Sequence, residues 1–388
     1  MGLLPQLKIA QKLPLALVGS ALVVSAGVGI ASYMIGLNTV QDQREQSMQA
    51  SLQTAASLVS DYYSDVEVDL RLFARRSDTV TAMKNLARGV SELRMAMGDK
   101  AGEILQKAYV TGNPNPEQRY LLDSANGMGG SYDAPHKRSH GGFRTLMLER
   151  GYSDVLLVSP EGEVVYSVGK NADFGANIVS NRDLAQSGLT KAFAAAKGLS
   201  ADQASFADYS IYAPVGAPLS FMAMPVFDGD ASIGVMVLAI APDVMSAKVS
   251  ALSGLGQSGE VVVVGSDGLL RTESPRTEAS DVLQTSLTSP VVAEALAGHT
   301  SEGTSTDYRA EPMVVRAQPV SVGNVTWAVV AAQPEAEVYA PVVRMGQLML
   351  TIGGALLAIA AVAGYFFARS VSRSATALVS DLSLAKAP

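Results

Sequence analysis

Two long hydrophobic stretches without charged residues constrain the fold of this chain more than any other feature. They run from Leu13 to Leu37 and from Met345 to Ala368, and neither contains Asp, Glu, Lys or Arg. At about 1.5 Å per residue, each is long enough to cross a hydrocarbon core of roughly 30 Å. A buried helix of a soluble domain would normally carry a polar stripe. We therefore predict transmembrane helices at 13–37 and 345–368. The first is interpreted as an uncleaved signal anchor, because its apolar region is longer than that of a signal peptide.

The distribution of charge predicts the orientation of these helices. Lys8 and Lys12 lie in the N-terminal segment 1–12, and Arg369, Arg373 and Lys386 follow the second stretch. Because basic residues stay on the cytoplasmic side, both ends are predicted to be cytoplasmic. The intervening part is exported and acidic, which disfavours a nucleic-acid partner. The chain has no cysteine, so this part must be held together by core burial instead of disulfides.

Helical periodicity dominates the first exported segment, 38–149. Apolar residues recur every three or four positions from Met48 to Phe73, which predicts a long amphipathic helix continuing from the first span. Its apolar stripe would pack against the sensor body or against a second subunit. Ser77 or Asp78 is a suitable N-cap for a following helix.

Two modules of similar pattern follow, at 150–252 and 253–344. Each begins with a predicted β-hairpin, and the hairpin turns PEGE and SDGL lie about 106 residues apart. The first module continues with strand candidates at 209–213, 219–226 and 233–240 and a helix after Pro242. The second continues with a helix at 290–296, strand candidates at 304–308, 313–318 and 325–332, and a helix from Pro334 into the second span. The predicted fold class is α+β: two tandem modules, each an antiparallel sheet with helices on one side, on a long N-terminal helix flanked by two transmembrane helices.

Four segments of the chain carry a family resemblance. The most specific runs from Tyr132 to Ile178, and the others span 109–116, 206–214 and 254–274. They are similar to sensory regions of bacterial methyl-accepting chemotaxis proteins and of some membrane-bound adenylate cyclases, in which two tandem PAS-like modules form a double Cache region. The resemblance implies a multi-pass protein of the bacterial inner membrane with a periplasmic sensor. It also implies a small ligand in the membrane-distal module, at residues 150–245, between the sheet and its covering helices and loops. Ligand binding would shift the helix that leads into the second span.

The segment after the second span departs from this family. Residues 369–388 resemble the start of a HAMP linker, but Ser374 follows Arg373 where the family has proline. No methyl-accepting, kinase or cyclase domain follows in the sequence. We therefore expect a receptor that is not an enzyme, with its output in a missing C-terminal domain or in a cytoplasmic signalling partner. The alternatives are the sensory half of an adenylate cyclase or histidine kinase, or an anchored solute-binding protein without output.

Several motifs are weak indicators of chemistry. The match GLGQSG at 254–259 precedes a strand, the reverse of a dinucleotide-binding turn, and SVGK at 167–170 lacks companion motifs. His136 and His140 could share a helical face, but a third metal ligand is missing, so we interpret them as polar lids or structural hydrogen-bonding residues. Two interpretations remain open for Asp154, Asp173 and Asp208. They are either exposed carboxylates in turns or groups for acid-base chemistry. No catalytic residue, metal or cofactor is predicted.

A binding pocket requires an apolar cavity with a few convergent polar groups. Arg144 and Lys170 could pair with a carboxylate or amino-acid ligand, and tyrosines would form the walls. Asp243 resembles in position a carboxylate that contacts amino groups in related sensors, although a helix N-cap after Pro242 is the simpler interpretation. Trp327 is predicted to pack in the core of the second module, and a homodimer would pair the long helices on a two-fold axis. The candidate ligand-binding residues are Tyr132, His136, Arg144, Tyr166, Lys170, Asp208, Tyr209, Tyr212 and Asp243.

Overall fold

The computed structural model describes residues 9–127, 130–252, 255–306 and 308–384, and the chain forms two compact units. One unit is Met48–Pro334, which contains both sheets. The other consists of the terminal segments, up to Ser47 and from Glu335. The helices are α1 (Ile9–Ala74), α2 (Ser77–Met97), α3 (Ala101–Gln106), α4 (Asp133–Arg150), α5 (Gly188–Ala196), α6 (Asp243–Ser250), α7 (Pro290–Leu296) and α8 (Glu335–Leu384). The strands are β1 (Asp154–Val158), β2 (Val164–Ser167), β3 (Ser205–Tyr212), β4 (Ala217–Asp228), β5 (Ala231–Ile240), β6 (Glu260–Val264), β7 (Ser301–Ser305), β8 (Met313–Val322) and β9 (Val325–Pro334).

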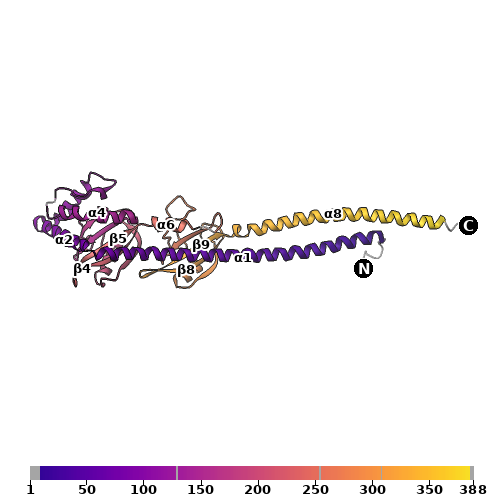
Figure 1. Cartoon of the computed structure of the whole chain (residues 1–388), viewed down its shortest axis with the longest axis horizontal. Coiled ribbons are helices and arrows are strands. Elements are labelled where there is room, and N and C mark those ends of the chain that lie inside the picture. Colours follow the sequence, from indigo (N-terminus) through magenta and orange to yellow (C-terminus); the bar gives the residue numbers. More distant parts are fainter. Residues whose placement is uncertain (1–8, 128–129, 253–254, 307, 385–388) are drawn as a thin grey trace. The chain divides into compact units, whose positions relative to one another are not determined.

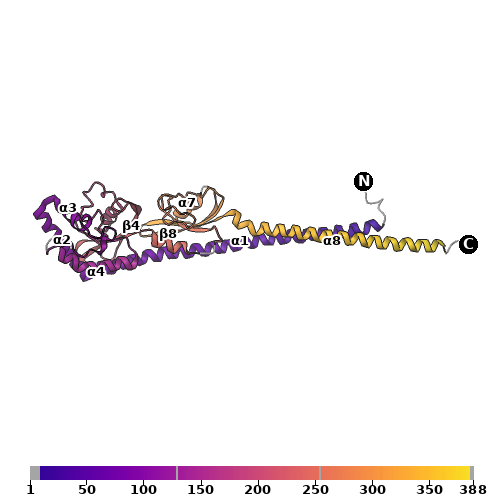
Figure 2. The same ribbon diagram turned by 90° about the horizontal axis from the view of Figure 1, so that it is seen from above.

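The sensor part of α1 buries the stripe that its sequence predicts. Seven of the predicted stripe residues are buried, and α1 passes along both sheets of the unit (Figures 1 and 2). Each fully buried large apolar side chain contributes about 1.5–3 kcal/mol relative to an exposed one. The helix therefore serves as a common support for two sheets. These buried residues are Met48, Leu52, Ala55, Val59, Tyr62, Val66 and Leu70.

The first module contains a five-stranded antiparallel sheet of order β2-β1-β5-β4-β3. One face packs with α5 around an apolar core that includes Leu156, Val237 and Phe193. Helix α4 ends at Gly151, whose φ of 73° is left-handed and suits glycine, and the chain then enters β1. The predicted hairpin of β1 and β2 is confirmed. The α4 helix was expected only as one possible setting for the two histidines, and α5 was not predicted.

The second module contains a four-stranded antiparallel sheet of order β6-β9-β8-β7, and α7 packs on its core. The predicted helix 290–296 is confirmed as α7. The second predicted hairpin is wrong in part, because 269–274 forms only isolated bridges and no strand. The side chain of Arg271 in this segment instead turns toward the first module, as described below.

Two further expectations about helix ends are wrong. Helix α2 begins at Ser77 itself, with Arg76 at the N-cap, so neither Ser77 nor Asp78 caps it. Helix α6 begins at Asp243, and Pro242 occupies the N-cap position. Asp243 is therefore an acidic residue in the first helical turn, where its negative charge interacts favourably with the positive end of the helix dipole.

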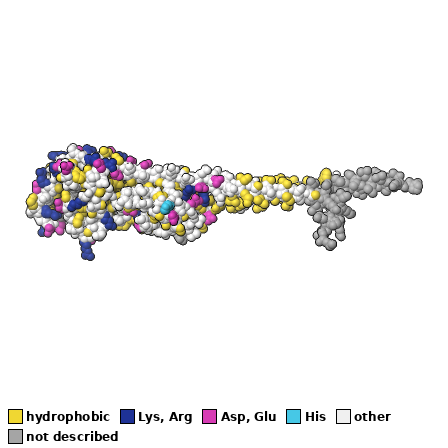
Figure 3. All heavy atoms as spheres, turned by 90° about the horizontal axis from the view of Figure 1, so that it is seen from below, with side chains coloured by type: hydrophobic (Ala, Val, Ile, Leu, Met, Phe, Trp, Pro, Cys, Tyr) yellow, Lys and Arg dark blue, Asp and Glu magenta, His cyan; other side chains and the backbone are white. Residues whose placement is uncertain are grey.

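The terminal unit consists of helical segments whose apolar side chains are exposed. Two helices, in the ranges Val18–Ala74 and Glu335–Phe367, are long and apolar enough to cross a membrane. Figure 3 shows charged side chains over the sensor unit and hydrophobic side chains along the helical segments. Met345 of α8 lies against Gly36 of α1 within this unit. Length and composition agree with the predicted spans, whose boundaries stay predictions.

Candidate functional site

Five of the buried side chains in the first module gather where α4 faces the end of β2, and we call them the polar cluster. They are Tyr132, His136, His140, Tyr166 and Lys170, and each is fully buried. The first three lie on α4 or just before it, and the other two lie on β2 or just after it. Four of the five were candidate ligand residues, so the fold brings together segments that are about 30 residues apart in the chain.

Hydrogen bonds fix the histidine tautomers of this cluster. Nδ1 of His136 lies 2.7 Å from the carbonyl oxygen of Asp123, and Nε2 of His140 lies 2.7 Å from that of Tyr120. Because a carbonyl oxygen only accepts, both nitrogens carry protons. Nδ1 of His140 then accepts the hydroxyl of Tyr166 at 2.6 Å. Nε2 of His136 is left as a buried acceptor without a hydrogen-bond partner.

Burial keeps both histidines neutral. Desolvation, aided by the charge of Lys170, lowers the pKa of His140 to about 4 and that of His136 well below its ordinary value. The interpretation of these residues as hydrogen-bonding groups agrees with the geometry. In the part of the chain that the structure describes, no group of three or more His, Asp or Glu side chains is arranged to hold a metal ion.

Lys170 is a buried amine without a carboxylate partner. Its Nζ lies 3.3 Å from the carbonyl oxygen of Val168 and 3.3 Å from Nε2 of His140, which already carries a proton. Lys170 forms no ion pair with any of the described residues. Burial lowers its pKa to about 7. Its φ of 51° is uncommon for a residue other than glycine, and its N–H donates to Oγ of Ser167 at 2.8 Å.

Two carboxylates beside Lys170, those of Asp154 and Asp173, are buried, which excludes one of their two open interpretations, that of exposed turn residues. Asp154 accepts the hydroxyl of Ser167 at 2.6 Å and the N–H of Gly169 at 2.8 Å, and burial nevertheless raises its pKa. Asp173 accepts the hydroxyl of Tyr212 at 2.7 Å, while its Oδ1 has no hydrogen-bond partner. Burial raises the pKa of Asp173 to about 7.

A segment between α3 and α4 covers the polar cluster. Besides the two carbonyl groups held by the histidines, the carboxylate of Asp123 pairs with Arg144 at 3.0 Å, and Arg119 donates to Asn171 at 2.9 Å. Arg144 therefore contacts this covering segment, which we call the strap (residues 118–123). The guanidinium of Arg144 is occupied by the strap in this structure.

Sequence reasoning missed Tyr109, whose hydroxyl donates to Asp133 at 2.6 Å and whose ring lies 4.5 Å from that of His136. Tyr109 opens one of the segments that carried the family resemblance, which was the only signal for it. Arg119 and Asn171 were also missed, since their contacts depend on how the strap folds back.

Asp208 and Tyr209 lie at the junction between the two modules and make no contact with the polar cluster. The carboxylate of Asp208 accepts hydrogen bonds from Nε and Nη2 of Arg271, each at 2.9 Å, and from Nε1 of Trp327 at 3.2 Å. The rings of Tyr209 and Trp327 stack at 6.1 Å, and Tyr63 of α1 meets Trp327 edge-on at 5.4 Å. Trp327 therefore packs between the modules, which corrects its assignment to the core of the second module. These five residues form the inter-module junction.

Asp243 also lies outside the polar cluster, at the exposed start of α6. Tyr212 connects the two regions, because it lies on β3 with Asp208 and Tyr209 and contacts Asp173. The structure thus brings together Tyr132, His136, Tyr166 and Lys170, with Arg144 and Tyr212 next to them. It separates Asp208, Tyr209 and Asp243 from this group.

The second module contains a corresponding set of polar residues that is neutralised internally. Glu260 begins β6 as Asp154 begins β1, and it accepts the hydroxyl of Ser274. Arg309 lies 3.4 Å from Glu260 and 3.5 Å from Asp281, and the hydroxyls of Thr277 and Thr285 also donate to Asp281. Each buried carboxylate here has a guanidinium partner, in contrast to Lys170 and Asp173.

Comparisons with known proteins agree with this architecture. A family model described as a Cache domain matches residues 37–342. A protein of Sinorhizobium fredii named as a probable chemoreceptor, y4sI, is 25% identical over 243 residues, which cover 61% of this chain and 30% of the relative. This chain thus spans less than a third of that relative's length.

Two solved structures are among those that the chain matches with low overall similarity. The ligand-binding domain of the Pseudomonas fluorescens chemoreceptor CtaA, in complex with L-serine, has a TM-score of 0.40 and 12% identity, covering 76% of this chain and 98% of that one. The ligand-binding domain of the Pseudomonas aeruginosa chemoreceptor PctB, in complex with L-Gln, has a TM-score of 0.40 and 12% identity, covering 76% and 92%.

Proposed function

This chain belongs to the Cache domain family, and on that premise we propose that it is the sensor of a bacterial chemoreceptor anchored in the inner membrane. Its periplasmic first module binds a small solute that carries a carboxylate, such as an amino acid. Binding is signalled across the membrane through α8, to a cytoplasmic partner or a C-terminal output domain joined by the HAMP-like segment 369–388. The chain itself is not an enzyme.

The observation that carries this proposal is the difference in charge pairing between the two polar interiors. In the second module the buried acids Glu260 and Asp281 are matched by Arg309. In the first module Lys170 has no carboxylate, and His136 Nε2 and Asp173 Oδ1 have no hydrogen-bond partner. Because buried polar groups are otherwise almost always satisfied, these three indicate where a ligand supplies the missing partners. A carboxylate would pair with Lys170, and a hydrogen-bond donor would reach His136 or Asp173.

The strap would have to open for this ligand. It is held by the two histidine contacts, by Arg144 and by Arg119, so its release exchanges a few hydrogen bonds for those of the solute. A ligand that favours one of two strap positions by about 1–3 kcal/mol would suffice to bias a helix displacement of about 1–2 Å.

The experiment is a thermal-shift screen of the full chain in detergent against amino acids, organic acids and amines. At least one carboxylate should raise the melting temperature, because a ligand that binds only the folded state stabilises it. The variant Lys170→Met should lose this shift. Lys191→Met, which changes an exposed lysine of α5, should keep it. A complete library without any shift would contradict direct ligand sensing by this chain.

A further inference from the structure

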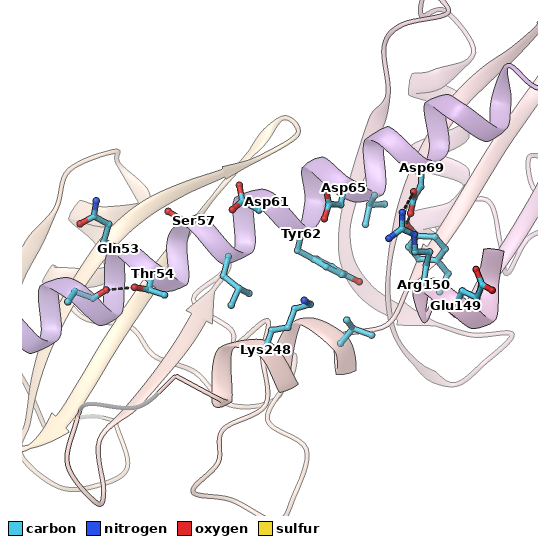
Figure 4. Close-up of a pocket in the computed structure, with 15 residues that line it drawn as sticks. Gln53, Thr54, Ser57, Asp61, Tyr62, Asp65, Asp69, Glu149, Arg150 and Lys248 are labelled. Atoms are coloured by element: carbon cyan, nitrogen blue, oxygen red, sulfur yellow. Dashed lines mark hydrogen bonds and ion pairs between the residues drawn. The ribbon is translucent and has the colours of Figure 1, made fainter. Parts of the chain in front are cut away.

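A concave surface lies on the sensor unit, away from the polar cluster, and we call it the α1 groove. It has a volume of about 920 Å³ and is lined by α1 from Ala50 to Asp69, by the end of α4 and by α6 (Figure 4). None of its charged residues takes part in the proposed binding of a carboxylate.

Acidic side chains dominate the groove. Asp61 and Asp65 of α1 and Glu149 of α4 are exposed and form no ion pair within the described residues. The carboxylate of Asp69 already has partners, because it accepts hydrogen bonds from Arg150 at 2.8 Å and from the hydroxyl of Tyr152 at 2.7 Å. The only other cation that lines the groove is Lys248 of α6. The lining therefore carries four carboxylates against two cations, an excess of two negative charges.

Tyr62 supplies an independent indication of a missing group. Its side chain is only 9% exposed, and its hydroxyl is buried without a hydrogen-bond partner among the described residues. In Figure 4 the ring extends from α1 toward α6 and the ammonium group of Lys248. A buried hydroxyl without a partner is uncommon, since it forfeits about 1–3 kcal/mol of hydration. Burial and the nearby charge of Asp243 raise the pKa of Tyr62 to about 12, so the hydroxyl stays neutral.

The spacing of the carboxylates favours an organic dication over a metal ion. Asp61 and Asp65 are one helical turn apart, which separates them by about 6 Å along the axis. A Ca²⁺ or Mg²⁺ ion needs several oxygens at about 2.0–2.6 Å, which side chains spread along a helix do not supply. An extended chain of four methylene groups, by contrast, separates two ammonium groups by a similar distance to these carboxylates.

We propose that the α1 groove binds a short aliphatic diamine, with its ammonium groups at Asp61 and Asp65 and one N–H donated to the hydroxyl of Tyr62. The methylene chain would lie against Leu58, Val66 and the ring of Tyr62, where a cation is also attracted to the aromatic face. Lys248 repels a third positive charge, so a triamine gains little over a diamine. The groove is thus a second ligand site, whose ligand has the opposite charge to that of the first module.

The test is isothermal titration of the full chain in detergent with butane-1,4-diamine. Asp61→Asn and Asp65→Asn should each weaken binding about tenfold, and the double variant should abolish it. Tyr62→Phe, which keeps the ring, should weaken it about threefold. Asp183→Asn removes an exposed carboxylate of the first module outside the groove and should leave the affinity unchanged.

Further arms separate specific binding from simple charge attraction. Butylamine, with one ammonium group, should bind at least tenfold more weakly, and spermidine should bind no more than about threefold more tightly. Lys170→Met should retain diamine binding, so a failure of the proposed carboxylate site would not affect this result. Absence of heat with the unmodified chain would overturn the proposal, as would Asp→Asn variants that bind the diamine as tightly as the unmodified chain. Equal binding of butylamine, or full displacement by Mg²⁺ at equal concentration, would also overturn it.

Discussion

At the scale of single residues, the most unusual feature is a buried lysine that forms no ion pair with a described carboxylate. Lys170 has a carbonyl oxygen and a protonated imidazole nitrogen as its nearest polar contacts. An ammonium group in such a place costs several kcal/mol of hydration, and part of this cost is avoided when the amine loses its proton. The residue therefore destabilises the ligand-free protein, and a carboxylate ligand would remove that penalty.

The pH dependence of stability should reveal this penalty. The pKa of Lys170 is about 7 in the folded protein and 10.5 as its ordinary value. Between these values the unfolded chain binds a proton that the folded chain does not, so the contribution of Lys170 to the free energy of unfolding rises with pH. From about pH 7 to about pH 10 this rise is at most about 1.4 kcal/mol per pH unit. Below about pH 7 both states are protonated and the full penalty remains.

We expect Lys170→Met to be more stable than the unmodified protein at neutral pH and to lack this rise. Urea denaturation at a series of pH values, with Lys191→Met as the matched control, measures both the difference in stability and its dependence on pH. Identical pH profiles for the unmodified protein and Lys170→Met would show that the amine is not desolvated in the folded state.

The residues that sequence reasoning predicted for the site divide according to the segment of the chain in which they lie. Tyr132, His136, Tyr166 and Lys170 lie in one segment and meet in the fold. Asp208 was chosen from the same kind of evidence, but it is bound by Arg271, which lies 63 residues further on. No local pattern indicates that partner, because it belongs to the other module.

At the scale of elements, β3 links the candidate ligand site to the second module. Tyr212 at its end contacts Asp173, and Asp208 on the same strand contacts Arg271 and Trp327. Trp327 lies on β9, the strand that directly precedes α8. A displacement of β3 by ligand would therefore reach the second module through a short series of direct contacts.

Removing the carboxylate of Asp208 should destabilise the sensor unit markedly. Arg271 is 3% exposed, and only the half-exposed Asp267 would remain to pair with it. We expect Asp208→Ala to cost about 2–4 kcal/mol, since it leaves a buried charge poorly compensated. The matched control is Asp228→Ala on β4, whose ion pair with Lys84 is exposed and should contribute less than about 1 kcal/mol.

Urea denaturation followed by far-ultraviolet circular dichroism measures both variants. The emission of Trp327, the single tryptophan of the chain, should change in Asp208→Ala and not in Asp228→Ala. Equal losses of stability in the two variants would mean that the junction is no stronger than a surface ion pair.

Most elements were predictable because their sequences alternate or repeat clearly. The buried stripe of α1 and the apolar runs of β1, β5, β6 and β9 were found with ends that differ by a few residues. Helix α5 was missed because it has only nine residues, which is too short for its apolar face to stand out as a periodic pattern. The local sequence of 269–274 favours a strand. Arg271 instead donates a hydrogen bond to Asp208 of the first module, and this tertiary contact overrides the local preference.

At the scale of the whole molecule, the described chain leaves apolar surface on α1 that a second copy could cover. Val68 and Leu72 are 44% and 61% exposed although they belong to the sensor unit. We expect the full chain to be a homodimer in detergent, and Leu72→Glu to increase the monomer fraction at least tenfold. Multi-angle light scattering over a range of concentrations measures this. Leu148→Glu on α4, another exposed leucine, tests whether the effect is confined to α1. A strictly monomeric unmodified chain would exclude the paired-helix arrangement.

The two modules share one plan, yet their buried charged groups are paired differently. In the second, every change to Glu260, Asp281 or Arg309 disturbs a closed set of ion pairs, so its interior tolerates little variation. In the first, Lys170, His136 and Asp173 are not committed to one another. We expect related chains to vary more at these residues of the first module than at the paired residues of the second. New solute preferences could then evolve without rebuilding the scaffold.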